Sequence, residues 1–241
     1  MASEPAAPDW YSHGLNRVAS YRLATGGAAA LPRSVRLRLA RGLGRLLARA
    51  LPAERRAVRS NLGRVLAGAS PAVIDARVRE TFANFGAFFA NLLTLNRRPG
   101  AALRDYVASA EGEHHLDAAI AAGRGVVLLT AHLGNWEFAG RLLSSRGGRT
   151  AHVVLSAEPA AFLPGPFVLA RAAGAAVVPA FCAMAPGGRY RLEIEPPIWV
   201  KPGEELAGLA TVVAALERVI RAYPTQWFNF FDAWSPPDGH A

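Results

Sequence analysis

The chain has 241 residues, which allows one substantial core or at most two small domains. Hydrophobic residues make up 51% of it, which excludes a disordered protein, and a formal net charge of +9 attracts nucleic acid, anionic membrane or acidic protein without choosing among them. The single cysteine, Cys182, excludes an internal disulfide and a cysteine-based metal cluster, and we expect it in the core.

The N-terminal residues 1–8 are acidic and contain proline, whereas a secretory signal has a basic region followed by an apolar one. No run of 18 consecutive apolar residues occurs, so no membrane-spanning helix is expected. These features predict a soluble or surface-bound protein in a reducing compartment.

Residues 34–50 predict a helix with an apolar face and a basic face. The first carries Val35, Leu39, Leu43, Leu46, Leu47 and Ala50, and the second carries Arg38, Arg41, Arg45 and Arg49. Such a helix lies in a membrane interface, or it packs on the core with a solvated arginine face. Gly42 and Gly44 weaken the helix and Arg36 interrupts the apolar face, so both interpretations stay open.

A further helix is predicted after Ser70 and Pro71, which have the pattern of an N-cap followed by a first-turn proline. An apolar, aromatic-rich stripe follows at helical spacing: Ile74, Val78, Phe82, Phe85, Phe88, Phe89 and Leu92. We expect this stripe in the core; the minor alternative is that part of it lines a groove for a hydrocarbon chain.

Strands and helices alternate through the second half of the chain. We expect helices over residues 116–122, 138–143, 167–173 and 207–222, and strands over residues 125–129, 151–155, 175–181 and 189–194. This order predicts an α/β fold with a mostly parallel central sheet flanked by helices. The first hundred residues are helical and are expected to wrap that sheet, so residues 1–241 form a single domain, helical over 1–100 and α/β over 101–241.

His132 and Glu137 lie at the exit of the buried strand predicted over residues 125–129, where α/β proteins present reactive side chains. On one regular helix, their separation would turn them apart by about 140°. They converge if His132 lies in a turn and Glu137 in the first turn of the next helix, and Gly134 and Asn135 suit such a turn. Glu137 would then orient the imidazole as a general base; the alternative is a histidine that caps a helix.

The string His-Leu-Gly-Asn-Trp-Glu at residues 132–137 resembles the His-x4-Asp/Glu motif of glycerolipid acyltransferases, and most of all the bacterial lipid A biosynthesis (lauroyl and myristoyl) acyltransferases. Further segments resemble that family in order along the chain: residues 56–62, 81–86, 111–112, 123–125, 173–179 and 223–227. The closing string at residues 228–234 is similar to relatives thought to acylate other lipid-type products, including those of aryl polyene gene clusters. The resemblance implies an acyltransferase-like α/β fold.

One departure from the family pattern concerns the middle of the chain. The family carries a helix, a strand and a polar substrate-binding segment before the region that resembles residues 162–166. Here residues 151–159 run almost directly into residues 162–166, so the chain lacks that section, and the junction lies on either side of residues 157–159. Loss of a central strand leaves backbone N–H and C=O groups that need new hydrogen-bond partners. It would also remove part of the segment with which the family binds the acceptor, and with it the basis for expecting activity.

The resemblance implies transfer of a fatty acyl group from acyl carrier protein or coenzyme A to a hydroxyl of a lipid or glycolipid, with no metal and no further cofactor. It makes His132 the general base and Glu137 its orienter. Backbone N–H groups near Gly134 would stabilise the oxyanion. The remaining candidates for substrate binding are Gly134, Asn135, Trp136 and, as a phosphate contact or a solvated arginine, Arg171.

The implied partners are acyl carrier protein, a lipid acceptor and an anionic membrane surface, with the chain peripheral to the cytoplasmic face of the bacterial inner membrane. The first alternative is a catalytically impaired homologue that binds lipid or acyl carrier protein. A nucleic-acid binder is not expected, because no recognition motif is found and the aromatic residues lie in apolar stripes. His114 and His115 are expected to be solvated or helix-capping.

Overall fold

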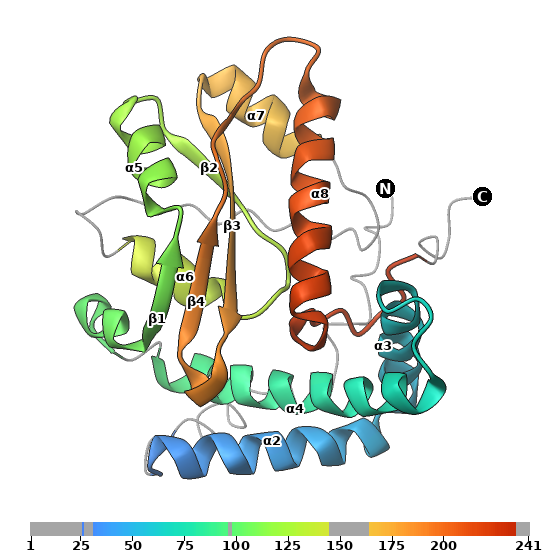
Figure 1. The fold of residues 1–241 in the computed structure, drawn as a ribbon. Coiled ribbons are helices and arrows are strands. Elements are labelled where there is room, and N and C mark those ends of the chain that lie inside the picture. The colour runs from blue at the N-terminus through green and yellow to red at the C-terminus, as the bar shows by residue number, and fades with distance from the viewer. Residues whose placement is uncertain (1–25, 27–30, 96–97, 145–163, 235–241) are drawn as a thin grey trace, which may run out of the picture.

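Helices surround a five-stranded sheet in the part of the chain that this computed structural model describes, residues 26, 31–95, 98–144 and 164–234 (Figure 1). The predicted strand over residues 151–155 and the junction near residues 157–159 lie outside these ranges. In chain order the elements are α2 (Arg33–Ala50), α3 (Pro52–Val65), α4 (Pro71–Leu95), η2 (Gly100–Tyr106), β1 (Val107–Glu111), α5 (Glu113–Ala121), β2 (Val126–Leu129), α6 (Trp136–Ser144), α7 (Gly165–Ala173), β3 (Ala176–Met184), η3 (Pro186–Gly188), β4 (Tyr190–Ile194), β5 (Ile198–Trp199), α8 (Glu205–Ala222) and η4 (Pro224–Gln226).

Helix α2 packs on α4 mainly through its small residues, and of the predicted apolar face Leu47 joins the core there. Gly44 and Ala48 are buried, and a Cβ on Gly44 would lie 2.1 Å from the carbonyl oxygen of Phe82 on α4. The leucine-rich stripe instead faces outward: Val35, Leu39, Leu43 and Leu46 are all exposed. The helix predicted over residues 34–50 is confirmed, but the interpretation that these four residues pack on the core is wrong, because the two backbones approach along the glycine side.

Helix α4 begins and packs as its sequence predicts. The backbone N–H of Val73 donates to the Ser70 hydroxyl at 3.4 Å, which confirms Ser70 as the N-cap. Along the stripe, Ile74, Val78, Phe82 and Phe88 are buried, whereas Phe85, Phe89 and Leu92 are half-buried. The core assignment is therefore confirmed for the first group, and the second group keeps surface for other contacts.

The sheet has the strand order β1-β4-β3-β2, and β5 pairs with β3. The pairs β1–β4 and β2–β3 are parallel, while β3–β4 and β3–β5 are antiparallel. Among the described strands β2 pairs with β3 alone, so it is half-buried rather than buried as predicted, and Leu128 is exposed.

The expectation of a mostly parallel sheet is not confirmed, because β3 and β4 form a hairpin. The connection is short: the Ala185 N–H donates to the Arg189 carbonyl at 2.7 Å, and Gly187 and Gly188 turn the chain with φ of 80° and 78°. A parallel pair needs a crossover of a dozen or more residues, which this connection does not have. The strand predicted over residues 189–194 is thus central, between β1 and β3.

Helices cover both faces of β3, whose side chains alternate between them. Val177 and Phe181 contact α7 and α8 on one face, while Val178 and Cys182 contact α5 and α6 on the other. Cys182 is fully buried, as expected. Beyond the sheet, α4 and then α2 form two further layers at the end where β3 meets β4 (Figure 1).

Candidate active site

A turn between β2 and α6 carries residues 132–135 of the His-x4-Glu motif, and α6 begins with the remaining two, Trp136 and Glu137. Gly134 has φ +63°, the left-handed region, and a Cβ there would lie 1.8 Å from the carbonyl oxygen of Cys182. Only glycine lets the turn approach β3 so closely. The strand, turn and helix predicted around His132 and Glu137 are therefore present.

Backbone hydrogen bonds hold this turn from two sides. The Gly134 N–H donates to the Gln226 carbonyl at 2.9 Å, and the Asn135 N–H donates to the Cys182 carbonyl at 2.8 Å. On the C-terminal side, the Phe228 N–H donates to the His132 carbonyl at 2.9 Å. The backbone of His132 is thus fixed between β3 and the segment that follows α8.

The side chain of Asn135, a candidate for substrate binding, makes hydrogen bonds within the protein. Its side chain is buried, and Oδ1 accepts from the Phe138 N–H at 3.0 Å, which caps the N-terminus of α6. Its Nδ2 donates to the hydroxyl of Tyr190 at 2.9 Å, and Nδ2 of Asn91 donates to the same hydroxyl at 2.8 Å. Burial raises the pKa of Tyr190, so this hydroxyl stays protonated near neutral pH.

His132 has the properties of a neutral base. The residue is exposed, while the protein packed around the rest of the ring lowers the pKa of the imidazole through desolvation. The ring of Trp136, a half-buried residue, lies 6.4 Å from the His132 ring between centroids. A histidine with a lowered pKa is unprotonated at neutral pH, which is the form that can accept a proton.

Glu137 lies in the first turn of α6 and is half-buried. Desolvation by burial raises the pKa of its carboxyl group, partly offset by a hydrogen bond from its own backbone. Its Oε2 atom is buried and has no hydrogen-bond partner among the described residues, and no hydrogen bond or ion pair joins it to His132 there. A buried carboxylate oxygen without a partner is costly, so it is available to a donor that arrives or reorients.

Gln226 fastens the end of β3, a role that the sequence analysis missed. Its side chain accepts from the Met184 N–H at 2.7 Å and donates to the Met184 carbonyl at 2.8 Å, while its own carbonyl holds Gly134. The residue lies in the segment 223–227, whose resemblance to the family marked it without giving its role. It therefore links the motif turn, β3 and the C-terminal segment.

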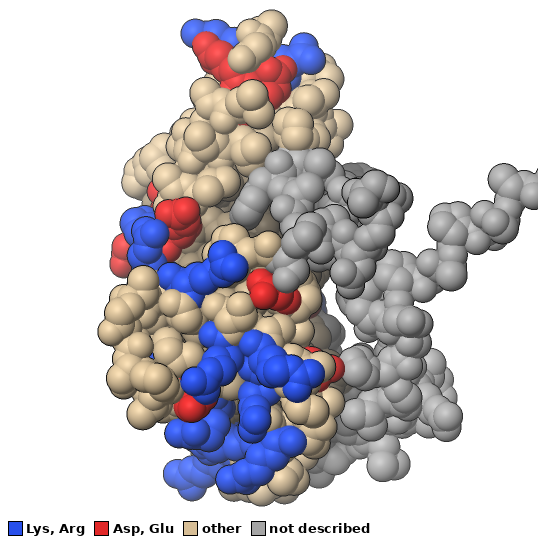
Figure 2. Space-filling model, turned by 90° about the vertical axis from the view of Figure 1, so that its right-hand side faces the viewer, with Lys and Arg blue, Asp and Glu red and all other residues tan. Residues whose placement is uncertain are grey.

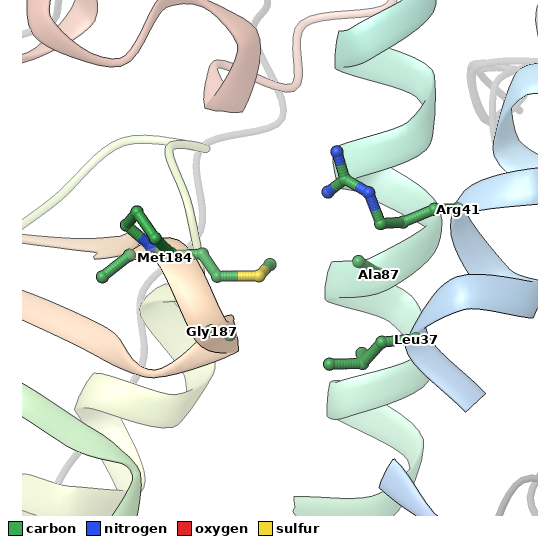
Figure 3. Close-up of a pocket in the computed structure, with 8 residues that line it drawn as sticks. Leu37, Arg41, Ala87, Met184 and Gly187 are labelled. Atoms are coloured by element: carbon green, nitrogen blue, oxygen red, sulfur yellow. The ribbon is translucent and has the colours of Figure 1, made fainter. Parts of the chain in front are cut away.

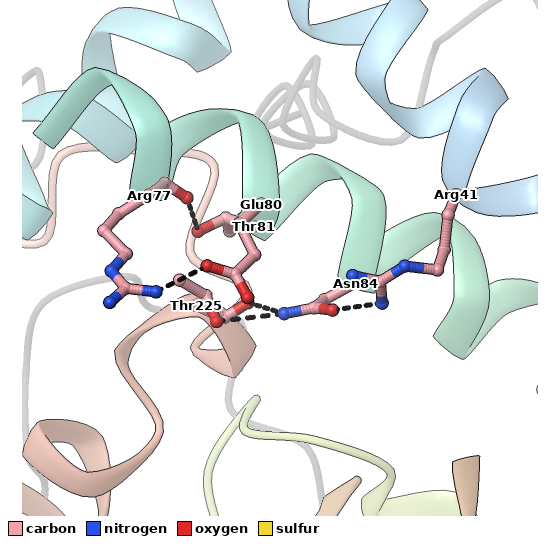
Figure 4. Close-up of polar contacts among 6 residues, drawn as sticks. All are labelled: Arg41, Arg77, Glu80, Thr81, Asn84 and Thr225. Carbon is pink, nitrogen blue, oxygen red and sulfur yellow. Dashed lines mark hydrogen bonds and ion pairs between the residues drawn. The ribbon is translucent and has the colours of Figure 1, made fainter. Parts of the chain in front are cut away.

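A polar chain on α4 holds the residue just before Gln226. Nδ2 of Asn84 donates to both the carbonyl (3.1 Å) and the hydroxyl (2.9 Å) of Thr225, and Oδ1 of Asn84 accepts from Arg41 of α2 at 2.6 Å (Figure 4). Asn84 and Thr225 are buried. The layer formed by α2 and α4 is thus bonded directly to the segment that clamps the motif turn.

Asn61 of α3 holds the aromatic end of the chain. Its Nδ2 donates to the carbonyls of Asn229 (3.1 Å) and Phe231 (2.8 Å), and its Oδ1 accepts from the Ala233 N–H at 3.0 Å. The segment 228–234 therefore lies against the N-terminal helices.

Aromatic rings from α4 and from this segment pack together next to the turn. Phe228 lies 5.4 Å from both Phe85 and Phe88 between ring centroids, and Phe230 lies 4.8 Å from Phe85 and 5.0 Å from Phe82. Because the backbone of Phe228 is bonded to that of His132, this cluster borders the candidate base. An apolar wall in that position suits a hydrocarbon chain.

A cavity of about 300 Å³ lies between α2, α4 and the β3–β4 hairpin (Figure 3). Leu37, Arg41, Ala87 and Met184 line it together with the hairpin residues 185–188. In Figure 3 the Arg41 side chain reaches along α4 toward the space beside Met184. The lining includes neither His132 nor Glu137, so this cavity is separate from the candidate base.

Arg171, expected as a phosphate contact or a solvated arginine, is exposed and is not brought to the motif turn. Its Nε lies 2.7 Å from Oε1 of Glu205, in an ion pair between α7 and α8. α7 leads directly into the start of β3, whereas Gly134 bridges to Cys182 near the other end of that strand. Arg171 is thus a surface arginine that links two helices.

The chain is similar in sequence to known acyltransferases. A family model of bacterial lipid A biosynthesis acyltransferases matches residues 21–156 and 149–235. Two proteins named phosphatidylinositol mannoside acyltransferase, from Mycobacterium tuberculosis strains CDC 1551 / Oshkosh and ATCC 25618 / H37Rv, are each 37% identical over 105 residues. The alignment covers 42% of this chain and 33% of each relative, so the chain spans about a third of the length of these curated relatives. The two stretches matched by the family model meet at residues 149–156, next to the junction inferred from the sequence.

Proposed function

The chain belongs to the bacterial lipid A biosynthesis acyltransferase family, and from this membership we propose that it transfers a fatty acyl group to a hydroxyl of a lipid or glycolipid. The proposed donor is acyl carrier protein, or coenzyme A, at the cytoplasmic face of the bacterial inner membrane. No metal and no cofactor beyond the acyl donor is part of the proposal. The net charge of +9 supports an acidic carrier protein as partner.

Two observations carry the proposal: the solvent-accessible imidazole of His132 has a lowered pKa, and the buried Oε2 of Glu137 has no partner among the described residues. Both residues belong to one strand-turn-helix unit, whose backbone is fixed by three hydrogen bonds to β3 and the C-terminal segment. A general base must be unprotonated and held in place. The lowered pKa of His132 favours the unprotonated imidazole, and backbone hydrogen bonds hold the turn that carries it.

In the proposed reaction, His132 takes the proton of the acceptor hydroxyl as the hydroxyl oxygen attacks the thioester carbonyl. The carbonyl becomes a tetrahedral oxyanion, which collapses to an ester and expels the thiolate of the donor; the imidazolium returns its proton to that thiolate. Oε2 of Glu137 is available to accept a hydrogen bond from the other ring nitrogen, and a negative charge there stabilises the imidazolium.

Two backbone N–H groups of the motif turn already have acceptors. The backbone N–H groups of Gly134 and Asn135 already donate to Gln226 and Cys182, so neither is free to stabilise an oxyanion in this arrangement. The apolar cluster around Phe228 supports a place for the acyl chain beside His132.

A second candidate function is a homologue that binds lipid or acyl carrier protein without turnover. The match of the family model in two stretches favours it, because a missing section would remove part of the acceptor site. The two functions differ in whether a new acyl ester forms.

The test is to incubate the full chain with acyl carrier protein or coenzyme A carrying a labelled acyl group, in the presence of a bacterial lipid extract. We expect a labelled lipid ester from the wild type and none above background from His132→Ala, identified by mass spectrometry. Binding of lipid or carrier protein with no ester from either donor would reject the enzyme and support the second candidate.

A further inference from the structure

Helix α2 presents an apolar stripe to solvent along most of its length. Leu39, Leu43 and Leu46 are 60%, 58% and 57% exposed, and Val35 is 38% exposed. Their spacing of four, four and three residues places them on one side of the helix. Exposed leucines are common singly, but a contiguous row on one helix marks an interaction surface.

The fold leaves this stripe without a protein partner among the described residues. The opposite side of α2 is the one that packs: Gly44 and Ala48 are buried, and Gly86 of α4 approaches so closely that a Cβ would lie 2.2 Å from the Ala40 carbonyl oxygen. Figure 1 shows α2 as the outermost layer, with α4 between it and the sheet. The stripe therefore faces away from the body of the molecule.

Arginines border the stripe, and α2 carries no acidic residue. Arg38, Arg45 and Arg49 are exposed, and at 100° per residue they lie about 100° around the helix from the centre of the leucines. They make no ion pair with an acidic side chain in the described part of the chain. Figure 2 shows Lys and Arg gathered over the lower part of the molecule, at the height where Figure 1 places α2 and α3.

We propose that α2 docks on an anionic lipid bilayer, with Leu39, Leu43 and Leu46 among the acyl chains and Arg38, Arg45 and Arg49 at the headgroups. A leucine row beside arginines, with no acidic residue to repel phosphate, matches the polarity of such an interface. A water-exposed leucine row without charges would suit another protein equally well; the unpaired arginines favour the lipid. No helix in the described ranges is long and apolar enough to cross a bilayer, so the contact lies in the interface.

In this orientation α2 and then α4 lie between the lipid and the sheet (Figure 1). α2 is bonded through Arg41 to Asn84 of α4, and Asn84 holds Thr225 beside the segment that clamps the motif turn. The docked helix is therefore linked by side-chain hydrogen bonds to the segment that holds the turn of His132. The docking inference goes beyond the proposed acyl transfer and does not depend on it.

The test is sedimentation of the full chain with vesicles of phosphatidylglycerol and phosphatidylcholine, and with vesicles of phosphatidylcholine alone. We expect binding to the anionic vesicles only, weakened by added salt. The variant Leu39→Ser/Leu43→Ser/Leu46→Ser should bind at least ~100-fold more weakly, because three large apolar side chains no longer enter the lipid. Arg38→Gln/Arg45→Gln/Arg49→Gln should lose about fivefold per arginine.

The matched control is Leu169→Ser/Leu206→Ser, which removes leucines that are 54% and 72% exposed on α7 and α8, at the other end of the sheet. This variant should bind the vesicles like the wild type. Unchanged binding of the α2 triple variant, or equal loss in the control, would overturn the proposal. Self-association of the wild type that the α2 triple variant abolishes would also overturn the proposal. A large fall in the melting temperature of the triple variant would do the same, because either result would show that protein covers the stripe.

Discussion

Gly134→Ala tests whether the close approach of the motif turn to β3 holds the candidate site. Alanine in the left-handed region costs about 1–2 kcal/mol. Its Cβ would lie 1.8 Å from the Cys182 carbonyl oxygen, so that oxygen must move and weaken the bond from the Asn135 N–H, a loss of about 1 kcal/mol. We expect the free energy of unfolding to fall by roughly 3 kcal/mol and the melting temperature by about 6–12 °C.

The assay is urea unfolding followed by circular dichroism, with acyl transfer measured at a temperature where the variant is folded. The matched control is Gly140→Ala in the neighbouring helix α6, where no atom lies within 4 Å of the added Cβ. That change should raise stability by about 1 kcal/mol through helix propensity. Equal stability of Gly134→Ala and the wild type, with transfer unimpaired, would refute the argument that this turn needs glycine.

Three further predictions concern groups around the turn. Tyr190→Phe leaves the buried amides of Asn91 and Asn135 without their acceptor and should lower the free energy of unfolding by about 3 kcal/mol in urea titrations; an unchanged midpoint would contradict it. Glu137→Gln should raise the free energy of unfolding at pH 7, because burial makes the ionised carboxyl unfavourable and an amide carries no charge. The same change should slow acyl transfer. Slower transfer without a gain in stability would contradict the unfavourable burial of this carboxylate. Because the pKa of His132 is lower in the folded chain than in the unfolded chain, the unfolded chain binds a proton at higher pH. The wild type should therefore lose stability relative to His132→Gln as the pH falls from 8 through about 6.5 to 5. Parallel stability curves for the two proteins would contradict that lowered pKa.

The helices were predictable from hydrophobic periodicity, but the packing of α2 was not. Periodicity identified the leucine stripe of α2 and assigned it to core or membrane. It did not predict that α2 packs on α4 at Gly44, where the absence of a side chain lets the two backbones approach. Similarly, strands 175–181 and 189–194 were recognised, while their antiparallel pairing depends on the short turn with Gly187 and Gly188.

The position of the candidate base was predictable because its residues are adjacent in sequence. The supporting residues come from distant segments: Tyr190 is 55 residues from Asn135, and Asn84 is 141 residues from Thr225. A pattern of neighbouring residues in the sequence cannot predict contacts between segments so far apart. Backbone N–H groups near Gly134 were expected to stabilise an oxyanion, whereas those of Gly134 and Asn135 donate to the C-terminal segment and to β3.

Whether His132 is the base of an acyl transfer is measured by the single-turnover rate from labelled acyl carrier protein to the lipid acceptor. The comparison is between His132→Ala and His114→Ala, the second of which removes an exposed histidine at the start of α5. We expect the rate to fall by about 10²–10⁴-fold in His132→Ala, the range for loss of a general base, and to stay at the wild-type value in His114→Ala. Equal rates for the wild type and both variants would contradict the role of His132 as the base.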